Sequence, residues 1–415
     1  MADQIFDIAV IGAGMVGTSS ALWLQRSGHT VALIDRTGPG TGTSFGNAGA
    51  FATYANVPIN SPSLPGRLPK LMFAKDSPLR IDWAHVLRMS PWLFKFLKNC
   101  SPSRVEAISD ALSSLLEHCE DGAFPLFKAS GADALIHSRG CLYLYDSEAA
   151  FAGAQGEMAL RRRHGIDMEV LGADEIGQLE PNVAKVYARG VYFPKAHQYV
   201  SPSGVIETMA RHFTANGGEL ITAEITGISK AADGTLELQS AGQSVRCRQM
   251  VLAAGAFSKT LFGGLIEPLP LETERGYHVV FPGHEGLLNR PVGWSAGGFY
   301  MTPMSHGLRA AGTVELGGLS DRKRQANLDH ITRHARKLLP DLPDQPAETW
   351  LGYRPTMPDS LPVIGRSNRT PEIIFAYGHQ HVGMTLGGIT GKLVAQIVDG
   401  EEPLVDLAPF APGRF

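Results

Sequence analysis

The sequence of 415 residues contains only four cysteines, and no two of them form a C-x-x-C pair. Scattered thiols of this kind signal neither a zinc site nor a redox dithiol, so we predict no bound metal and a reducing compartment. The chain also lacks an apolar run of the roughly 18 residues that a membrane-spanning helix needs. Its N-terminus lacks the basic segment and cleavable apolar stretch of a secretory signal. These absences together predict a cytoplasmic protein.

An excess of basic residues is also missing. Lys and Arg total 37 against 40 Asp and Glu, which gives a formal net charge of −3 and a pI near 6.5. This balance argues against a nucleic-acid partner. The length exceeds what one compact core usually holds, so we expect two domains that need neither disulfides nor metals for stability.

Residues 6–35 carry the most informative pattern, FDIAVIGAGMVGTSSALWLQRSGHTVALID. An apolar strand passes through Gly12, Gly14 and Gly17 into a helical pattern. A second apolar strand then ends in Asp35. This order is typical of a dinucleotide-binding βαβ unit, in which the glycines allow a tight turn, close approach of a pyrophosphate and close helix–strand packing. The helix N-terminus offers N–H groups to the phosphates, and Asp35 can accept hydrogen bonds from a ribose diol. The alternative is a glycine-rich turn in an ordinary α/β protein.

Local patterns predict further elements along the chain. The long loop 36–66 is rich in Gly, Ser, Thr and Pro, and loops of this length inside an α/β unit are usually functional. Ser201-Pro202 has the form of a helix N-cap followed by Pro at the first helical position. The predicted helices span 103–130, 202–216, 323–339 and about 388–398, and the predicted strands lie at 140–145, 189–193, within 219–246 around an Asp233-Gly234 turn, and at 248–252, 276–281 and 308–314.

The first and last parts of the chain have nucleotide-binding patterns, whereas the middle has an α+β pattern. We therefore predict an α/β plus α+β fold, in which a discontinuous Rossmann-like domain is interrupted by a mixed-sheet substrate domain. The predicted nucleotide domain comprises 1–60, 199–262 and 345–415, and the predicted substrate domain comprises 61–198 and 263–344.

Three features favour FAD over NAD as the dinucleotide. The segment RQMVLAAGAFS at 248–258 resembles the strand that flavoproteins return to the FAD site, with small residues Ala254 and Gly255 close to the cofactor. Only one credible G-x-G-x-x-G is present, so a separate NAD(P)H domain is not indicated. The segment YGHQHVGMTLGGITG near the C-terminus places a glycine-rich loop before a helix, which could cap a flavin ring. An NAD-dependent dehydrogenase stays open as an alternative.

Taken together, these segments resemble the D-amino acid oxidase superfamily of FAD-dependent oxidoreductases. Within it, the chain looks most similar to D-amino acid dehydrogenases and their D-hydroxyproline-oxidising relatives. The likeness runs essentially from end to end and is least diagnostic over 100–200. The residues that carry it are IGAGMVG at 11–17, DR at 35–36, TSFGNAG at 43–49, ERGYH at 274–278, YRPTMPDSLPVIG at 353–365 and GHQHVGMTLGGITG at 378–391.

The resemblance implies a set of cofactor contacts. Asp35 is expected to bind the adenosine ribose, and the segment 43–49 is expected to run under the isoalloxazine, with Gly49 giving clearance near N5. Backbone N–H groups at 383–385 would approach the flavin C2 carbonyl, where negative charge develops on reduction. No cysteine follows Cys247, which predicts noncovalent FAD and leaves a His linkage open. The predicted cofactor residues are Gly12, Gly14, Met15, Val16, Gly17, Asp35, Arg36, Ser44, Asn47, Ala48, Gly49, Ala254, Gly255, Gly383, Met384 and Thr385.

A substrate carboxylate would require an arginine, because the planar guanidinium matches two oxygens. Arg354 in YRP and Arg309 in GLRAAG are the two main candidates, and Arg275 is a weaker third. Either of the first two could instead be a surface residue. Tyr277 resembles an active-site tyrosine of the family, and strand alternation places His278 on the opposite face.

Three further residues complete the predicted catalytic set. Tyr54, in the loop that follows TSFGNAG, is expected to reach the substrate. His379 and His381 flank Gln380 ahead of the glycine-rich turn and are expected to hydrogen-bond the flavin or the substrate. Isolated histidines are more often structural, so a structural role for both stays open.

The predicted function is FAD-dependent dehydrogenation of D-amino acids or of a cyclic D-imino acid such as D-hydroxyproline. A neutral amine would lose a hydride from Cα to flavin N5, and electrons would pass to a quinone or a carrier protein. One alternative is an oxidase that uses O₂, similar to glycine or sarcosine oxidase. Another is a flavin-binding subunit of a larger dehydrogenase complex.

The stretch 67–98 combines seven Lys and Arg residues with tryptophan and phenylalanine. A basic amphipathic surface of this kind suits an anionic membrane, so peripheral contact with the inner face of a membrane is a second hypothesis. The alternative is a substrate-domain helix that packs normally.

Overall fold

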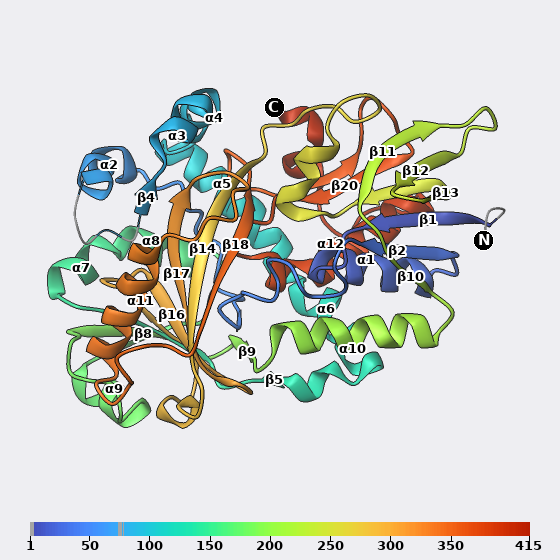
Figure 1. The fold of residues 1–415 in the computed structure, drawn as a ribbon. Coiled ribbons are helices and arrows are strands. Elements are labelled where there is room, and N and C mark those ends of the chain that lie inside the picture. The colour runs from blue at the N-terminus through green and yellow to red at the C-terminus, as the bar shows by residue number, and fades with distance from the viewer. Residues whose placement is uncertain (1–3, 74–76, 78) are drawn as a thin grey trace.

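The computed structural model describes residues 4–73, 77 and 79–415. Two large sheets lie side by side, and the cavity described below lies between them (Figure 1). The first sheet has a parallel centre in the order β10-β2-β1-β13, and β20 pairs with β13 in the same direction. The strands are β1 (Ile5–Ile11), β2 (Val31–Asp35), β10 (Glu219–Thr222), β11 (Ile225–Lys230), β12 (Leu236–Ser240), β13 (Gln243–Leu252), β19 (Val363–Arg366) and β20 (Ile373–Tyr377).

The predicted βαβ unit is confirmed as β1, α1 (Met15–Arg26) and β2. β1 is an almost continuous buried apolar strand, as expected for the centre of a parallel sheet covered on both faces. Gly12 has φ of 105°, and a Cβ there would lie 2.5 Å from the carbonyl oxygen of Ala253. A Cβ on Gly17 would overlap the carbonyl oxygen of Gly12. The turn and the close packing of α1 therefore both require glycine.

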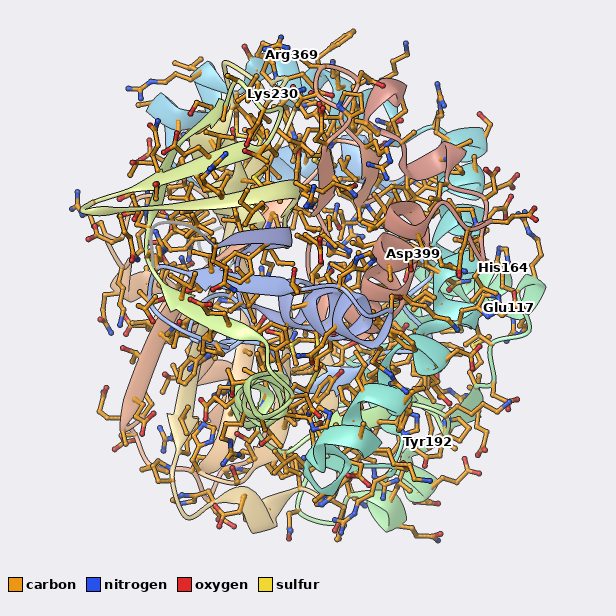
Figure 2. All side chains as sticks on the ribbon, turned by 90° about the vertical axis from the view of Figure 1, so that its right-hand side faces the viewer. Glu117, His164, Tyr192, Lys230, Arg369 and Asp399 are labelled. Atoms are coloured by element: carbon orange, nitrogen blue, oxygen red, sulfur yellow. The ribbon has the colours of Figure 1, made fainter. Side chains whose placement is uncertain are left out.

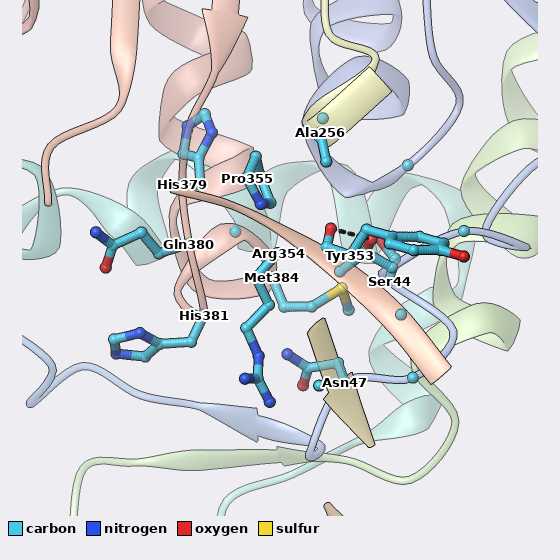
Figure 3. Close-up of a pocket in the computed structure, with 18 of the residues that line it drawn as sticks. Ser44, Asn47, Ala256, Tyr353, Arg354, Pro355, His379, Gln380, His381 and Met384 are labelled. Atoms are coloured by element: carbon cyan, nitrogen blue, oxygen red, sulfur yellow. Dashed lines mark hydrogen bonds between the residues drawn. The ribbon is translucent and has the colours of Figure 1, made fainter. Parts of the chain in front are cut away.

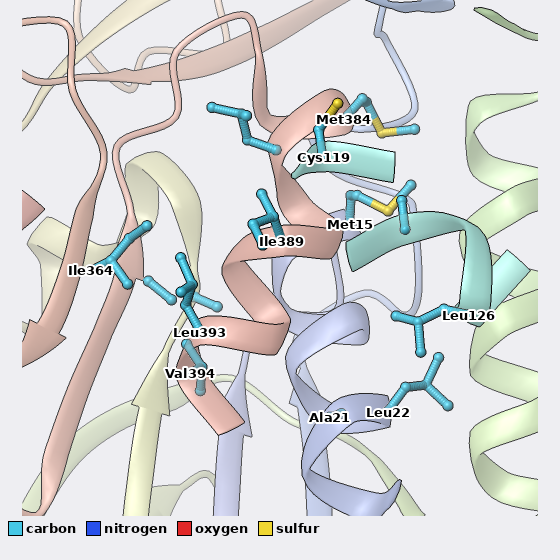
Figure 4. Packing of buried hydrophobic residues seen from close by; sticks show 14 of the residues in the cluster. Met15, Ala21, Leu22, Cys119, Leu126, Ile364, Met384, Ile389, Leu393 and Val394 are labelled. Carbon is cyan, nitrogen blue, oxygen red and sulfur yellow. The ribbon is translucent and has the colours of Figure 1, made fainter. Parts of the chain in front are cut away.

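A layer of helices covers one face of this sheet (Figure 1). Its centre is the pair α1 and α12 (Gly383–Asp399), with α10 (Pro202–Ala215) and α6 (Cys119–Ser130) beside them. Figure 4 shows Met15 of α1, Ile389 of α12 and Leu126 of α6 in one apolar cluster. α5 (Pro102–Glu117) supplies further residues to the same core.

Helix α12 begins five residues earlier than the predicted start at 388, because its glycines lie inside the helix. A Cβ on Gly387 would collide with the side chain of Met15, one on Gly391 would lie 2.6 Å from the backbone of Ser19, and one on Gly388 would lie 2.5 Å from the backbone of Ala123. The glycines therefore let α1 and α6 approach α12 closely. The prediction of a glycine-rich loop ahead of the helix was wrong for this reason.

The second sheet has the order β18-β14-β17-β16-β15-β6-β8-β7, with β4 paired to β17. It is mostly antiparallel, but β15–β6 and β17–β4 are parallel, so the predicted mixed sheet is confirmed. Helix α11 (Gln325–Leu338) packs on one face. The strands are β4 (Leu79–Ile81), β6 (Cys141–Tyr145), β7 (Glu169–Leu171), β8 (Arg189–Phe193), β14 (Glu272–Phe281), β15 (Val292–Trp294), β16 (Phe299–Met304), β17 (Gly307–Leu316) and β18 (Glu348–Thr356).

Two predicted domain boundaries do not match this packing. β18 belongs to the second sheet, where it pairs with β14 along its whole length, although 345–415 was assigned to the nucleotide domain. α5 and α6 share the core of α1 and α12, although 61–198 was assigned to the substrate domain. Both errors have the same cause. A helix or strand belongs to the domain whose apolar face it covers, and the local sequence does not show which face that is.

The remaining elements surround the two sheets. A small sheet joins β3 (Ala50–Phe51), β9 (His197–Tyr199) and β5 (Ile136–His137). Charged side chains such as Lys230, Arg369 and Asp399 lie at the surface (Figure 2). No described helix is long and apolar enough to span a bilayer. The other helices are α2 (Leu64–Phe73), α3 (Trp83–Arg88), α4 (Ser90–Lys98), α7 (Glu148–Gly153), α8 (Gln155–Arg163) and α9 (Ala173–Leu179).

Most of the predicted elements are confirmed. Residues 103–130 form two helices, α5 and α6, and Ser201 caps α10 by accepting the N–H of Gly204. The alternating segment 219–246 forms strands around the Asp233-Gly234 turn, and β13 ends at Leu252. The strands β15 and β16 were not predicted. Tyr300 on β16, which lines the cavity, was therefore not recognised as a candidate site residue.

Candidate functional site

A cavity of about 1110 Å³ lies between the carboxyl ends of the parallel strands and one face of the second sheet. Ligands in doubly wound proteins bind at this end of the strands. Its wall combines segments from both parts of the chain, and Figure 3 shows part of it. The main contributing segments are 12–16, 35–37, 253–257, 350–355 and 379–384.

The N-terminus of α1 forms one end of the cavity. Gly14 is the N-cap residue and has no side chain to cap the helix, and residues 14–16 line the cavity. The N–H of Met15 donates to Ser44 Oγ at 3.2 Å. A helix N-terminus is a ready anion site, which fits the predicted pyrophosphate contact at Gly12, Gly14 and Val16.

Asp35 ends β2 beside this turn and lines the cavity. One carboxylate oxygen accepts the N–H of Ala13 at 2.8 Å, and the other accepts those of Thr37 and Gly38 at 2.9 and 3.0 Å. The neighbouring Arg36 lies 3.6 Å above the Phe257 ring. Asp35 thus holds the loop and presents a negative charge to the cavity, as a ribose contact requires.

The segment 43–49 crosses the cavity, where Ser44, Asn47 and Ala48 line the wall as predicted. Asn47 Oδ1 accepts the N–H of Gly49 at 2.7 Å. Gly49 itself does not line the cavity. It has φ of 79°, and a Cβ there would lie 2.6 Å from the Met304 methyl group. The predicted clearance beside the flavin was wrong, because the close approach at Gly49 is to the second sheet.

Arg309 forms hydrogen bonds with the backbone of this segment. Its guanidinium donates to the carbonyl oxygens of Phe45 and Asn47 at 2.6 and 3.0 Å and is 1% exposed. Burial lowers its pKa to about 10. Arg309 does not line the cavity, so the prediction that it binds the substrate carboxylate was wrong. Its hydrogen bonds are used to position the backbone of residues 45–47.

The N-terminus of α12, which packs beside that of α1, also borders the cavity, where Gly383 and Met384 line the wall. No side chain caps this helix either, so the backbone N–H groups of its first turn are available for an acceptor. Thr385 does not line the cavity. Its hydroxyl accepts the N–H of Ala52 at 2.9 Å and ties α12 to the segment after β3.

His379, Gln380 and His381 lead into α12 and line the cavity. The Nε2 of His379 lies 2.9 Å from the Thr390 hydroxyl, and burial lowers the pKa of His379 to about 3. Burial and the charge of Arg354 lower the pKa of His381 to about 4. Both imidazoles are therefore neutral at pH 7. Gln380 adopts φ of 49°, a strained backbone of the kind found at functional sites.

Arg354 extends from β18 into the cavity, where Figure 3 shows its side chain together with that of Asn47. Its guanidinium donates to the carbonyl oxygen of Thr313 at 2.9 Å. It passes over Gly276, where a Cβ would collide with it. Glu274 lies directly opposite on β14 and also lines the cavity. Burial raises the pKa of Glu274, and the positive charge of Arg354 opposes that rise.

The polar ends of Tyr277 and Arg275 extend toward Glu315 and the start of α11, although Tyr277 also lines the cavity. The Tyr277 hydroxyl donates to Glu315, and Arg275 forms a buried ion pair with the same carboxylate. The backbone N–H of Arg324 also points to the Tyr277 hydroxyl, at 3.2 Å. The substrate role of Tyr277 stays a prediction, because Tyr277 lines the cavity while its hydroxyl is engaged by Glu315. The predicted alternation is correct, and His278 faces the other way, stacked on Trp350.

Tyr54 lines the cavity as predicted, and the structure adds residues that the sequence analysis missed. The Tyr54 hydroxyl lies 3.3 Å from that of Tyr300 on β16. Tyr143 on β6 and Arg161 on α8 complete this part of the wall. Their signal was the alternation of LYLY and FYMTPM, but both strands must first be paired to β15, which lies between them, before their tyrosines are seen to share a face.

The cavity fits a large cofactor with polar edges. Two helix N-termini line it, as phosphate contacts require. Several glycines line it as well, at positions where an added Cβ would collide with neighbouring atoms. Gln380 Nε2 and Thr313 Oγ1 are buried at its wall without hydrogen-bond partners within the protein. Orphaned polar atoms of this kind are expected where a ligand completes the site.

Residues 7–397 match the family model described as FAD dependent oxidoreductase. The chain belongs to this family. The prediction of family and of FAD as cofactor is confirmed. FAD as the cofactor replaces the alternative of an NAD-dependent dehydrogenase. Residues of the α1 turn, Asp35, and the α12 N-terminus would hold FAD.

Sequence and structure comparisons agree with this assignment. The chain is 35% identical over 415 residues to a D-amino-acid oxidase from Bradyrhizobium diazoefficiens, with 98% of each chain covered. Its fold is similar to glycine oxidase from Geobacillus kaustophilus, with a TM-score of 0.76, 23% identity and 99% of each chain covered. It is also similar to L-proline dehydrogenase from P. horikoshii, with a TM-score of 0.74, 18% identity, and 100% of this chain and 98% of that chain covered. The predicted Rossmann-like plus mixed-sheet fold is confirmed.

Proposed function

We propose that this flavoenzyme oxidises D-amino acids or a cyclic D-imino acid such as D-hydroxyproline. The observation that carries the proposal is Arg354, whose cavity-lining guanidinium donates to two backbone carbonyls and lies near the carboxylate of Glu274. Its remaining N–H groups can hold a carboxylate by charge and by hydrogen bond. The 35% identity to a protein named D-amino-acid oxidase supports the D-configuration.

The protein groups bind and orient the substrate. Bound FAD would supply the acceptor for the hydride of the Cα–H bond, which carries both electrons. Arg354 anchors the carboxylate, so that Cα and the amine are held at a fixed distance from it. Neutral His379 and His381 add no positive charge that would oppose loss of the amine proton. The substrate leaves as an imine, which hydrolyses to a 2-oxo acid and ammonia or stays cyclic if it derives from a proline-type amine.

The two leading functions, dehydrogenase and oxidase, differ in the acceptor that reoxidises the flavin. We propose a dehydrogenase that passes electrons to a quinone or a carrier. An oxidase that uses O₂ is the second candidate, and it is favoured by the names of the relative from Bradyrhizobium diazoefficiens and of the glycine oxidase neighbour. We also propose that FAD is bound noncovalently, because the described cavity wall includes no cysteine.

We expect D-amino acids or D-imino acids to bleach the visible flavin band of the purified protein under anaerobic conditions. A panel of D-, L- and cyclic amino acids tests this directly, and the L-enantiomers serve as matched controls. Reduction by none of the panel would contradict the proposal, and a protein with little activity alone would favour a subunit role. Peroxide formation in air at the rate of turnover would favour the oxidase.

Helices α3 and α4 support the proposal of membrane contact. Trp83, Leu87 and Phe94 are 50%, 75% and 73% exposed, and they are among the few exposed large apolar side chains in the described part of the chain. The exposed cations Arg88 and Lys95 lie among them. α3 and α4 stand at the periphery in Figure 1. Large apolar groups beside cations suit an anionic bilayer surface.

This surface lies close to the cavity. Trp92 and Phe96 face inward from α4 and form a buried cluster, against which Ile59 packs. Ile59 also lines the cavity. Contact of α3 and α4 with a bilayer would therefore bring a lipid-soluble quinone near the cofactor.

Wild-type protein is expected to sediment with phosphatidylglycerol vesicles and not with neutral phosphatidylcholine vesicles at moderate salt. The double variant L87E/F94E should bind the anionic vesicles at least about tenfold more weakly, since each apolar side chain loses roughly 1.5 kcal/mol or more of burial. Leu404, 41% exposed and far along the chain, supplies the control L404E. Equal binding of wild type and double variant would exclude this surface as the contact.

A further inference from the structure

Tyr143, Tyr300 and Arg161 form a polar end of the cavity that the proposed carboxylate and amine contacts leave unused. Tyr143 pairs with Gly293, and Gly293 pairs with Tyr300, so the two tyrosines stand in one row across three adjacent strands. A Cβ on Gly293 would collide with the Tyr143 ring and lie 2.7 Å from the Tyr300 ring. Glycine between them therefore lets both rings lean over the same spot, with centroids 5.7 Å apart.

Neighbouring groups hold this end in place. The Tyr54 hydroxyl lies 3.2 Å from Cys141 Sγ and 3.3 Å from the Tyr300 hydroxyl, and the Tyr54 ring stacks on Phe193 at 3.9 Å. If Tyr54 donates to Tyr300, the Tyr300 hydroxyl proton is left to point into the cavity. Burial raises the pKa of Tyr54, Tyr143 and Tyr300, so these phenols stay protonated and can donate.

Arg161 adds a positive charge to this end. Its Nε donates to the carbonyl oxygen of Tyr54 at 3.3 Å, and its guanidinium lies 5.6 Å from the Phe193 ring. Glu157, one turn earlier on α8, is 3.7 Å away and half exposed. The guanidinium therefore keeps N–H groups for a ligand. Donors dominate this end, whereas an apolar side chain would require an apolar wall.

Arg354 reaches along the cavity face of the second sheet toward this end. It lies on β18, but its guanidinium passes over Gly276 on β14 and donates to the carbonyl oxygens of Thr313 and Gly312 on β17. Tyr300 on β16 and Tyr143 on β6 follow in the strand order β18-β14-β17-β16-β15-β6. One molecule that spans this wall therefore meets a cation and hydrogen-bond donors at each end.

We propose that Tyr143 and Arg161 bind an oxygen substituent, a hydroxyl or a carboxylate, on the side chain of the substrate whose α-carboxylate Arg354 holds. This inference rests on the proposed function, because it assumes an amino-acid substrate. It assigns the enzyme to substrates with a second oxygen function and makes Arg161 a specificity residue. Unsubstituted hydrocarbon side chains would leave both donors without a partner, which costs binding energy.

Two matched substrate pairs test the subsite, D-hydroxyproline against D-proline and D-glutamate against D-norvaline. We expect wild-type kcat/KM, measured from anaerobic flavin reduction, to favour the oxygenated member of at least one pair by about tenfold or more, as a hydrogen bond to a charged group is worth about 1.5 kcal/mol or more. The pair that shows the preference tells hydroxyl from carboxylate. R161M and Y143F should bring this ratio close to one and leave kcat/KM for the hydrocarbon partner within about threefold.

The neighbouring Arg162 is exposed and supplies the control R162M, which should keep the wild-type ratio. A second readout avoids turnover: glutarate and valerate cannot be oxidised at Cα as amines, and their affinities for the holoenzyme are measured by calorimetry. If carboxylate is the ligand, glutarate binds more tightly and R161M abolishes the difference. Two outcomes would overturn the subsite alone. One is activity on the hydrocarbon substrates with no preference in either pair, and the other is an equal loss of kcat/KM for both members of a pair in R161M. Reduction by none of the four would overturn the proposed function as well.

Discussion

Replacing Arg354 with methionine is expected to raise KM for the amino-acid substrate about 100- to 1000-fold, which corresponds to roughly 3 to 4 kcal/mol of lost binding. The guanidinium stands at the cavity wall and already has two backbone carbonyls as partners, so its remaining N–H groups are oriented before substrate arrives. Methionine keeps much of the length and removes the charge and the hydrogen bonds. The measurement is the substrate dependence of anaerobic flavin reduction.

Arg354→Lys separates charge from geometry. Lysine retains the charge but cannot form two parallel hydrogen bonds, so its KM should lie between those of wild type and R354M. The exposed Arg104 supplies the control R104M, which should behave as wild type. A wild-type KM in R354M would show that the carboxylate binds elsewhere, and Arg161 would then be the next candidate.

Alanine substitutions at Gly14 and Gly17 are expected to separate cofactor binding from folding. A Cβ on Gly17 overlaps the carbonyl of Gly12, so G17A should lose more than about 3 kcal/mol of unfolding free energy, as overpacking against backbone cannot relax. At Gly14 φ is −76°, and only Ser44 Oγ lies within 4 Å of the added Cβ, at 3.2 Å. G14A should therefore fold with nearly wild-type stability but retain little FAD, because the methyl group projects at the phosphate end.

Denaturant unfolding of FAD-free protein gives the stability, and the ratio of flavin to protein absorbance gives the FAD content. Gly156 lies inside α8 with nothing within 4 Å of an added Cβ, so G156A is a control that should keep its FAD and gain slightly in stability. Full FAD content in G14A would contradict the assignment of this turn to the cofactor. Wild-type stability in G17A would contradict the packing of α1 on β1.

Sequence patterns were reliable where the information is local. The spacing of Gly12, Gly14 and Gly17 predicted the turn, and the turn is present with the dihedral angle that glycine permits. The N-cap at Ser201 and the strand that ends at Leu252 follow from residues within a few positions of each other. Capping, periodicity and backbone freedom act over one or two turns of chain, so a single sequence displays them.

The predicted arginines show where local information ends. Arg309 and Arg354 look alike in sequence, since each follows a glycine-containing strand segment. In the structure, Arg309 lies beneath the loop 43–49 and bonds its backbone, whereas Arg354 passes over Gly276 into the cavity. Tyr277 similarly faces α11 because a helix remote in sequence covers that side of β14. The role of each of these side chains depends on the strand that pairs with its own strand and on the helix that covers it.

The sequence by itself therefore determined the dinucleotide turn, the family and its cofactor, and most of the helices and strands. Tertiary structure decided which residues share the cavity: Arg309 and Gly49 lie outside its wall, and Glu274, Tyr300, Tyr143 and Arg161 line it. The physical reason is that strand register sets which side chains stand in one row. That register is fixed by burial of apolar faces between segments far apart in the sequence, such as Val292 and Leu142, which are 150 positions apart.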